Sequence, residues 1–228
     1  MKLAKSAVDI GLFTNNLDSM LSFWQGDVGL PFDQVLPVRR GLKQYRHDAS
    51  NSVVKINHSV APLAAAAPSG YLELIVAQDH DQENRHLADP DGNRVLLVPF
   101  GDLGITQIGI RIGVRNIDAH RQFYSQALGL PEEACKTGAA FRAGESLIIL
   151  EQNPEAGTNP GFEGPGWRYI TFQVFKVDDV HAAIIASGGR EALAPVTLGT
   201  TARISMVLDP DGNWIELSQR ASIVGTLT

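Results

Sequence analysis

The chain has 228 residues, of which 44% are hydrophobic and 19% are charged, and its formal net charge is −6. This composition is ordinary for a globular protein, so it excludes an intrinsically disordered or fibrous chain. Because the chain is acidic and has no basic cluster larger than Arg39-Arg40, we expect no nucleic-acid partner.

The sequence has no apolar run of the roughly 18 residues that a membrane-spanning helix needs. Its first residues lack the apolar core of a signal peptide. The one cysteine, Cys135, cannot form an internal disulfide. We therefore expect a cytoplasmic protein with no membrane partner.

The first half of the chain begins with an alternating pattern typical of a strand, followed by a helix that ends at Gly29. A linker over residues 61–70 leads to a second strand at Tyr71–Val76. Only about a dozen polar residues separate this strand from Asp89-Pro90-Asp91-Gly92-Asn93, so no full crossover helix fits between them. A complete unit would consist of a strand, a helix and further strands. We expect one complete unit here and a second unit that is cut short.

The second half contains two complete units. Ile108–Val114 alternates apolar and other residues, which predicts a half-buried strand. A helix follows, capped by Asn116 or Asp118 and ended by Gly129, and Ser146–Glu151 is a further strand.

A Gly- and Pro-rich linker over residues 153–166 precedes the last unit. This unit begins with a strand at Trp167–Val177 and a helix at Asp178–Ser187. Its remaining strands are expected at residues 192–197, 202–209 and 214–219.

Two motifs occur once in each half of the chain. Gly29-Leu30-Pro31 returns as Gly129-Leu130-Pro131, and Asp89-Pro90-Asp91-Gly92-Asn93 returns unchanged as Asp209-Pro210-Asp211-Gly212-Asn213. Because the motifs follow in the same order in both halves, we predict a duplicated domain.

Strict alternation sorts the side chains of the second half onto two faces of its strands. The helix of each unit must cover one face, and apolar residues should point toward it. That face takes Ile108, Leu150, Ile170, Ile215 and Leu217. The opposite, cupped face takes the polar residues Gln107, Glu151, Tyr169 and Glu216. Two carboxylates, an amide and a phenol are oxygen-rich enough to suggest a divalent-metal site.

The paired units, the Gly-Leu-Pro turns and the C-terminal Asp209-Pro210-Asp211-Gly212-Asn213-Trp214-Ile215-Glu216-Leu217 resemble the glyoxalase/bleomycin-resistance/extradiol-dioxygenase (vicinal oxygen chelate) superfamily. The resemblance implies an α+β fold of tandem glyoxalase-like domains, built from βαβββ units that form cupped mixed sheets. We expect a degenerate, partly truncated domain at residues 1–102, and a domain with the better-formed site at residues 103–228.

The resemblance also implies metal ligands, because the family takes them from the first and last strands of its units. Those positions hold Gln107, Glu151, Tyr169 and Glu216. Tyr169 replaces the usual histidine, and a neutral phenol is a weak ligand. The metal would be divalent zinc, nickel, iron, manganese or cobalt, or none would be bound. Glu216 and Glu151 are the expected catalytic residues, and the expected substrate contacts are Tyr169, Trp167, Trp214 and Arg111.

An alternative site is expected in the first half. The positions that correspond to the four ligands hold Asp9, Lys55, Tyr71 and Leu96, and a lysine and a leucine cannot ligate a divalent cation. This half would therefore be structural or bind an organic ligand without metal. Its candidate site residues are Asp9, Tyr45, His47 and Lys55, with Asn57 beside them.

Three functions follow as hypotheses. The first is a metal-dependent enzyme that moves a proton next to a carbonyl of a small oxygenated substrate, as glyoxalases and epimerases do. The second is an extradiol ring-cleavage dioxygenase, in which Gln107 and Tyr169 would stand in the places of two histidines. The third is a metal-free protein that binds an antibiotic-like small molecule between aromatic walls. In each case the partner is a small molecule, and the chain would be a monomer or a homodimer.

Overall fold

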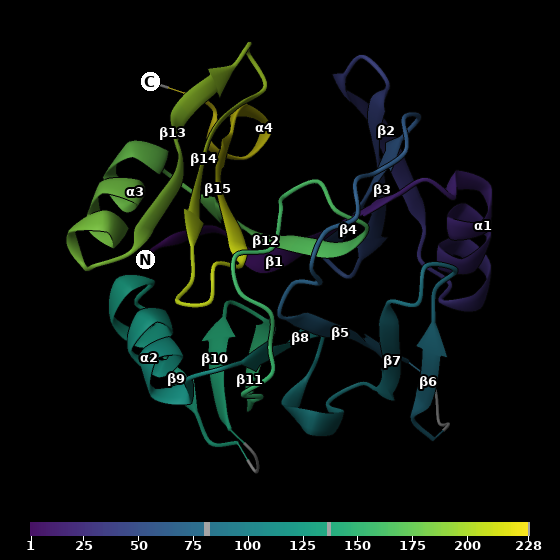
Figure 1. Ribbon diagram of the computed structural model, residues 1–228, viewed down its shortest axis with the longest axis horizontal. Coiled ribbons are helices and arrows are strands. Elements are labelled where there is room, and N and C mark those ends of the chain that lie inside the picture. Colours follow the sequence, from purple (N-terminus) through teal and green to yellow (C-terminus); the bar gives the residue numbers. More distant parts are fainter. Residues whose placement is uncertain (80–82, 136–137, 228) are drawn as a thin grey trace.

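The computed structural model describes residues 1–79, 83–135 and 138–227, and two sheets form the body of the protein (Figure 1). The eight-stranded sheet has the order β13-β14-β15-β12-β1-β4-β3-β2. Its strands are β1 (Leu3–Thr14), β2 (Phe32–Arg39), β3 (Leu42–Ala49), β4 (Ser52–Ser59), β12 (Gly166–Val174), β13 (Arg190–Leu198), β14 (Ala202–Leu208) and β15 (Trp214–Arg220). The seven-stranded sheet has the order β6-β7-β5-β8-β11-β10-β9. Its strands are β5 (Tyr71–Gln78), β6 (Arg85–Ala88), β7 (Arg94–Pro99), β8 (Ile108–Val114), β9 (Glu132–Glu133), β10 (Ala139–Ala143) and β11 (Ser146–Gln152).

The helices α1 (Leu17–Ser22), α2 (Ile117–Gln122) and α3 (Val177–Ala186) are short, and each connects strands of the same unit. Both α1 and α2 continue into a π-helical turn, and α3 belongs to the last unit. The remaining helical segments are η1 (Phe23–Asp27), η2 (Asp102–Gly104), η3 (Phe123–Ala127) and α4 (Ala221–Val224). Asn116 caps α2 by accepting hydrogen bonds from two backbone N–H groups, as predicted. The α+β class is confirmed, and none of the helices in the described ranges is long and apolar enough to cross a membrane.

One apolar core lies between the sheets and under the helices. It contains strand residues of both sheets, such as Ile10 and Ile110, together with Trp24 and Tyr124 from the π-helical turns. The helix-side residues predicted by alternation are all buried in it: Ile108, Leu150, Ile170, Ile215 and Leu217. The other face of each sheet is therefore left to form a cup.

Each sheet combines strands from both halves of the chain. β1 pairs antiparallel with β12 in the eight-stranded sheet, and β5 pairs antiparallel with β8 in the seven-stranded sheet. The predicted boundary between residues 102 and 103 was derived from the sequence repeat. Both sheets contain strands from either side of it. The first unit joins the fourth, and the shortened second unit joins the third, as the strand labels in Figure 1 show.

The repeated Asp-Pro-Asp-Gly-Asn motif links the two sheets. The aspartate that opens each copy accepts a hydrogen bond from the backbone N–H of Asn93 or Asn213, at 2.8 Å, which closes the turn. The asparagine side chains then reach the other sheet. Asn93 Oδ1 accepts from the N–H of Trp167, and Asn213 Oδ1 accepts from the N–H of Gly70. The duplicated motif is therefore a structural connection that occurs twice.

Candidate functional site

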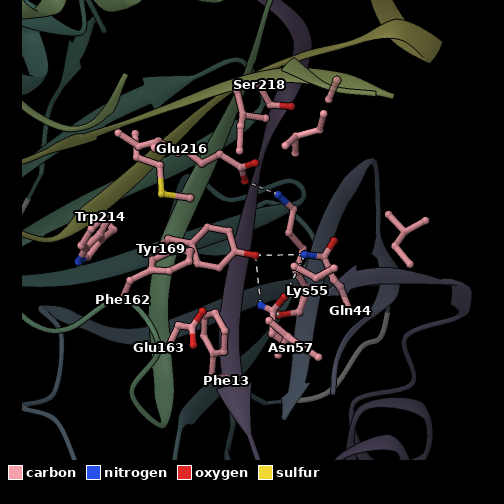
Figure 2. A pocket seen from close by; sticks show the side chains of 18 of the residues that line it. Phe13, Gln44, Lys55, Asn57, Phe162, Glu163, Tyr169, Trp214, Glu216 and Ser218 are labelled. Carbon is pink, nitrogen blue, oxygen red and sulfur yellow. Dashed lines mark hydrogen bonds and ion pairs between the residues drawn. The ribbon is translucent and has the colours of Figure 1, made fainter. Parts of the chain in front are cut away.

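The concave face of the eight-stranded sheet encloses a cavity of about 710 Å³ (Figure 2). One side is aromatic, with the Phe162 ring centroid 5.0 Å from that of Trp214 and 5.3 Å from that of Tyr169. Aliphatic side chains also line the cavity, among them those of Leu36, Leu193, Ile204 and Met206. Polar side chains line the floor: Gln44, Arg46, Lys55, Asn57, Glu216, Ser218 and Arg220. An apolar cavity with a few converging polar groups is typical of a small-molecule site.

Strand register brings the polar floor together from both halves of the chain. Asp9 of β1 pairs with Thr171 of β12, and Thr171 pairs with Glu216 of β15. Two residues after Asp9, Gly11 pairs with Lys55 of β4. Because residues two apart on a strand share a face, all five lie on the concave side. Asp9 and Lys55, expected in a separate first-half site, therefore share one site with Glu216.

The ammonium group of Lys55 lies at the centre of this floor. Lys55 Nζ is 2.9 Å from Glu216 Oε2, 2.6 Å from Thr171 Oγ1 and 3.9 Å from Asp9 Oδ2. Thr171 Oγ1 also donates a hydrogen bond of 2.6 Å to Glu216 Oε2. The side chains of Lys55 and Asp9 are 4% and 0% exposed, so these charges are almost completely removed from water.

This donor set does not fit a divalent metal ion. The oxygens of Asp9, Thr171 and Glu216 surround a cation that the chain itself provides, and the ammonium group has no lone pair with which to ligate a metal. Among the residues that the structure describes, no group of three or more His, Cys, Asp or Glu side chains is arranged to hold a metal ion.

The equivalent positions of the seven-stranded sheet are mostly apolar. Gln107, just before β8, corresponds to Asp9 of β1. The backbone carbonyl of Gln107 accepts a hydrogen bond from the N–H of Ala77, and Ala77 pairs with Val98. Gly109 corresponds to Gly11, and its partner Leu147 therefore occupies the position that Lys55 has in the other sheet. A cluster that includes Ile75, Leu96, Ile105 and Ile149 packs on this concave face. The second cup is therefore filled by the protein's own side chains.

The predicted metal ligands are divided between the two sheets. Tyr169 and Glu216 line the cavity of the eight-stranded sheet, whereas Gln107 and Glu151 belong to the other cup. Gln107 donates to Glu145. Arg111 donates to Glu151 and to Glu73, the latter at 3.0 Å. The predicted set of four is thus not brought together, and Arg111 forms ion pairs away from the cavity.

The hydroxyl group of Tyr169 has its acceptor positions filled by two amides. Gln44 Nε2 and Asn57 Nδ2 donate to it at 3.2 and 3.1 Å, as Figure 2 shows. The amide orientations follow from their other partners, because Arg46 donates to Gln44 Oε1 and Asn57 Nδ2 donates to the carbonyl of Leu12. A phenol has one proton and two acceptor sites, so the O–H of Tyr169 is left for a molecule in the cavity.

Tyr169 is a neutral donor at ordinary pH. Burial, and then the nearby carboxylate of Glu216, raise the pKa of its phenol far above the usual value of about 10. A protonated phenol that accepts two hydrogen bonds is suited to donate its own hydrogen to a ligand oxygen.

Gly11 provides the space in which the Tyr169 ring lies. A Cβ atom at this position would be 2.3 Å from both Cε1 and Cζ of Tyr169 and 2.8 Å from its hydroxyl oxygen. Only glycine permits so close an approach of strand β1 to the ring.

Of the other predicted substrate contacts, Trp214 lines the cavity. Trp167 instead lies in the central core, where its ring centroid is 5.7 Å from that of Trp24. It lies outside the concave face because β1 and β12 change register between Gly11 and Leu12, and this bulge alters the alternation.

Tyr45 and His47 lie on the helix side of the eight-stranded sheet, not in the cup. They pair with Ile56 and Val54, two core residues of β4. Burial lowers the pKa of His47 from 6.5 to about 4, so this ring is neutral near pH 7. On β3, Gln44 and Arg46 are the residues whose side chains line the cavity. The predicted pattern missed them because the phase of β3 cannot be recognised in such a polar segment.

The comparisons with known proteins agree with this architecture. Residues 104–217, half of the chain, match the model of the Glyoxalase/Bleomycin resistance protein/Dioxygenase superfamily. No curated protein sequence matches the chain. Glyoxalase I from Zea mays is similar in structure, with a TM-score of 0.79, 15% identity and coverage of 96% of this chain and 95% of that one. A candidate dioxygenase from Bacillus subtilis has a TM-score of 0.71 at 11% identity, covering 98% and 91%.

At these identities the structural likeness shows a shared fold, and the predicted tandem glyoxalase-like fold is confirmed. The family model covers the second half, and the first half has one unit of the same kind, β1–α1–β2–β3–β4, followed by three strands with no helix among the described residues between them. The chain belongs to the Glyoxalase/Bleomycin resistance protein/Dioxygenase superfamily.

Proposed function

We propose that the chain binds a small organic molecule in the cup of the eight-stranded sheet without a divalent metal ion. The observation that carries this proposal is the position of Lys55, whose ammonium group lies among the oxygens of Glu216, Thr171 and Asp9. A cavity of about 710 Å³ with aromatic and aliphatic walls supports an apolar ligand body.

The polar floor indicates a ligand that carries an oxygen acceptor. Gln44 and Asn57 both donate to the hydroxyl oxygen of Tyr169, so we infer that its own O–H points away from these two amides. A carbonyl oxygen in the cavity would accept this hydrogen bond. The metal-dependent reaction expected from the sequence has less support, because Glu216 and Glu151 face different cups.

The binding proposal is tested with 6-propionyl-2-dimethylaminonaphthalene, a neutral fluorescent aromatic ketone whose emission responds to its surroundings. We expect it to bind the wild type equally well with and without EDTA. Tyr169→Phe should weaken binding about tenfold, since it removes the hydrogen bond from the phenol to the ketone oxygen.

Two variants locate the probe. Ala202→Phe adds bulk at a residue that lines the cavity and should abolish binding, whereas Ala182→Phe adds the same bulk on the exposed side of α3 and should not. Loss of binding in EDTA, or equal binding by the two phenylalanine variants, would contradict the proposal.

A second candidate function is metal-independent proton transfer next to a carbonyl. The observation that favours it is that Glu216 Oε2 receives both hydrogen bonds, from Lys55 and Thr171, while no described residue bonds to Oε1. Glu216 Oε1 would take a proton from the carbon beside the carbonyl. The C–H electron pair would form a C=C bond, and the charge that develops on oxygen would be stabilised by the O–H of Tyr169. Return of the proton to carbon regenerates Glu216.

This chemistry predicts exchange of the methylene hydrogens of 2-hydroxyacetophenone in D₂O, followed by proton NMR. We expect wild-type protein to accelerate the exchange and Glu216→Gln to remove the acceleration, because an amide cannot accept the proton. Glu155→Gln, a change at an exposed linker carboxylate, is the matched control. If the wild type exchanges these hydrogens no faster than buffer does, proton transfer by Glu216 is contradicted for this class of ketone.

A further inference from the structure

We infer that Arg46 and Arg220 form a carboxylate-binding site in the cavity, so that the ligand is an organic monocarboxylate with an apolar body. This inference rests on the proposed function, because it assigns the class of molecule that the same cavity binds.

Arg46 is a buried guanidinium with unused donors. Its side chain is 7% exposed and lines the cavity. One of its five N–H groups bonds to Gln44 Oε1 at 2.9 Å. Its Nε is buried with no hydrogen-bond partner in the described chain, and the nearest carboxylate oxygen, Asp33 Oδ2, lies at 3.7 Å. A buried N–H without an acceptor destabilises the protein, and an anionic ligand would offset this cost.

Arg220 faces the same cavity from the other half of the chain. Its side chain lines the cavity and forms no hydrogen bond or ion pair with the residues that the structure describes. Burial, and then the charge of Arg46, lower the pKa of this guanidinium. Two arginines that line the same cavity with most of their donors unused are typical of a site for an anion.

The charges around the cavity leave room for one negative charge on the ligand. Lys55 and Glu216 form an ion pair with each other, and at the rim Glu163 pairs with Arg39. Asp9 pairs with Lys5 at 2.7 Å. Arg46 and Arg220 then remain, and Asp33, whose Oδ2 is 3.7 Å from Arg46 Nε, is the remaining carboxylate that acts on them. An excess of about one positive charge, inside a chain whose net charge is −6, matches a monocarboxylate.

Strand β15 sets the expected shape of the ligand. Trp214, Glu216, Ser218 and Arg220 alternate along it and all line the cavity. At about 3.3 Å per residue, the Cα atoms of Trp214 and Arg220 are about 20 Å apart. An elongated molecule would therefore place its aromatic part near Trp214 and its strand partner Tyr169, and its carboxylate toward Arg220, with Glu216 and Ser218 between them.

The test compares 4-biphenylacetate with its neutral amide, 4-biphenylacetamide, as competitors of the bound naphthyl ketone probe. We expect the carboxylate to displace the probe from the wild type at a concentration at least about tenfold lower than the amide does, because hydrogen bonds to a charged group are the stronger ones. Arg220→Met and Arg46→Met should each remove most of this preference, which is measured within each variant as the ratio of the carboxylate and amide concentrations that displace the probe.

Arg85→Met removes the same charge from an exposed position on β6, outside the cavity, and should keep the preference. If the carboxylate and the amide displace the probe equally, or if the preference survives both cavity substitutions, the carboxylate site is overturned while metal-free binding stands. If the probe itself does not bind to the wild type, the proposed function fails and the inference fails with it.

Discussion

Replacement of Lys55 by methionine is expected to lower the free energy of unfolding by about 3–5 kcal/mol, the usual cost of removing one partner of a buried ion pair. Asp9 is fully buried and Glu216 is 14% exposed, so the loss of the ammonium leaves two carboxylates in a poorly solvated cup. Asp9 keeps its contact with Lys5 at 2.7 Å, and most of the cost should therefore arise at Glu216.

Urea denaturation of the wild type and the variant measures this difference. Lys43→Met is the matched control, because Lys43 is exposed on the same sheet and its loss should change stability by less than about 0.5 kcal/mol. The double variant Lys55→Met/Glu216→Gln should recover part of the loss, since no uncompensated charge remains at Glu216. Equal stabilities of Lys55→Met and Lys43→Met would show that the ammonium is not the charge that balances this site.

Gly11→Ala is expected to destabilise the protein by about 1–3 kcal/mol through overpacking and to weaken binding of the aromatic ketone. The added methyl group would be 2.3 Å from two ring atoms of Tyr169, and strands β1 and β12 are central in their sheet, so neither can easily move apart. The ring would turn away from Gln44 and Asn57, and its hydroxyl would no longer be held toward the cavity. Thermal unfolding and probe titration measure the two effects.

Gly26→Ala is the control for this change, because a Cβ at Gly26 would have no atom within 4 Å. We expect it to leave both quantities almost unchanged. Combining Gly11→Ala with Tyr169→Leu should cost less than the sum of the two single changes, since the smaller side chain relieves the contact. Strict additivity would mean that Gly11 does not act through the Tyr169 ring.

The faces of the strands could be predicted from the sequence because they depend on a local period of two. Ile108, Ile170 and Ile215 are buried in the core, and Tyr169 and Glu216 line the cavity, as alternation indicated. Where a bulge interrupts the period, as between Trp167 and Tyr169, the same reasoning failed. A polar strand such as β3 has no apolar face from which its phase can be read, and for this reason Tyr45 and His47 were expected in the cup.

The sequence by itself determined the units, their helices, the connecting turns and the family, because these depend on short-range periodicity, capping residues and motifs. Only the tertiary structure decided which units share a cup. Lys55 and Glu216 are 161 positions apart and meet because β1 pairs with β12, while Glu151 lies in the other sheet. Nothing local distinguishes this pairing from the alternative in which each half closes on itself. Because the first unit pairs with the fourth, the ammonium group of Lys55 lies beside the carboxylates of Glu216 and Asp9, in the cup where the sequence had predicted a divalent metal ion.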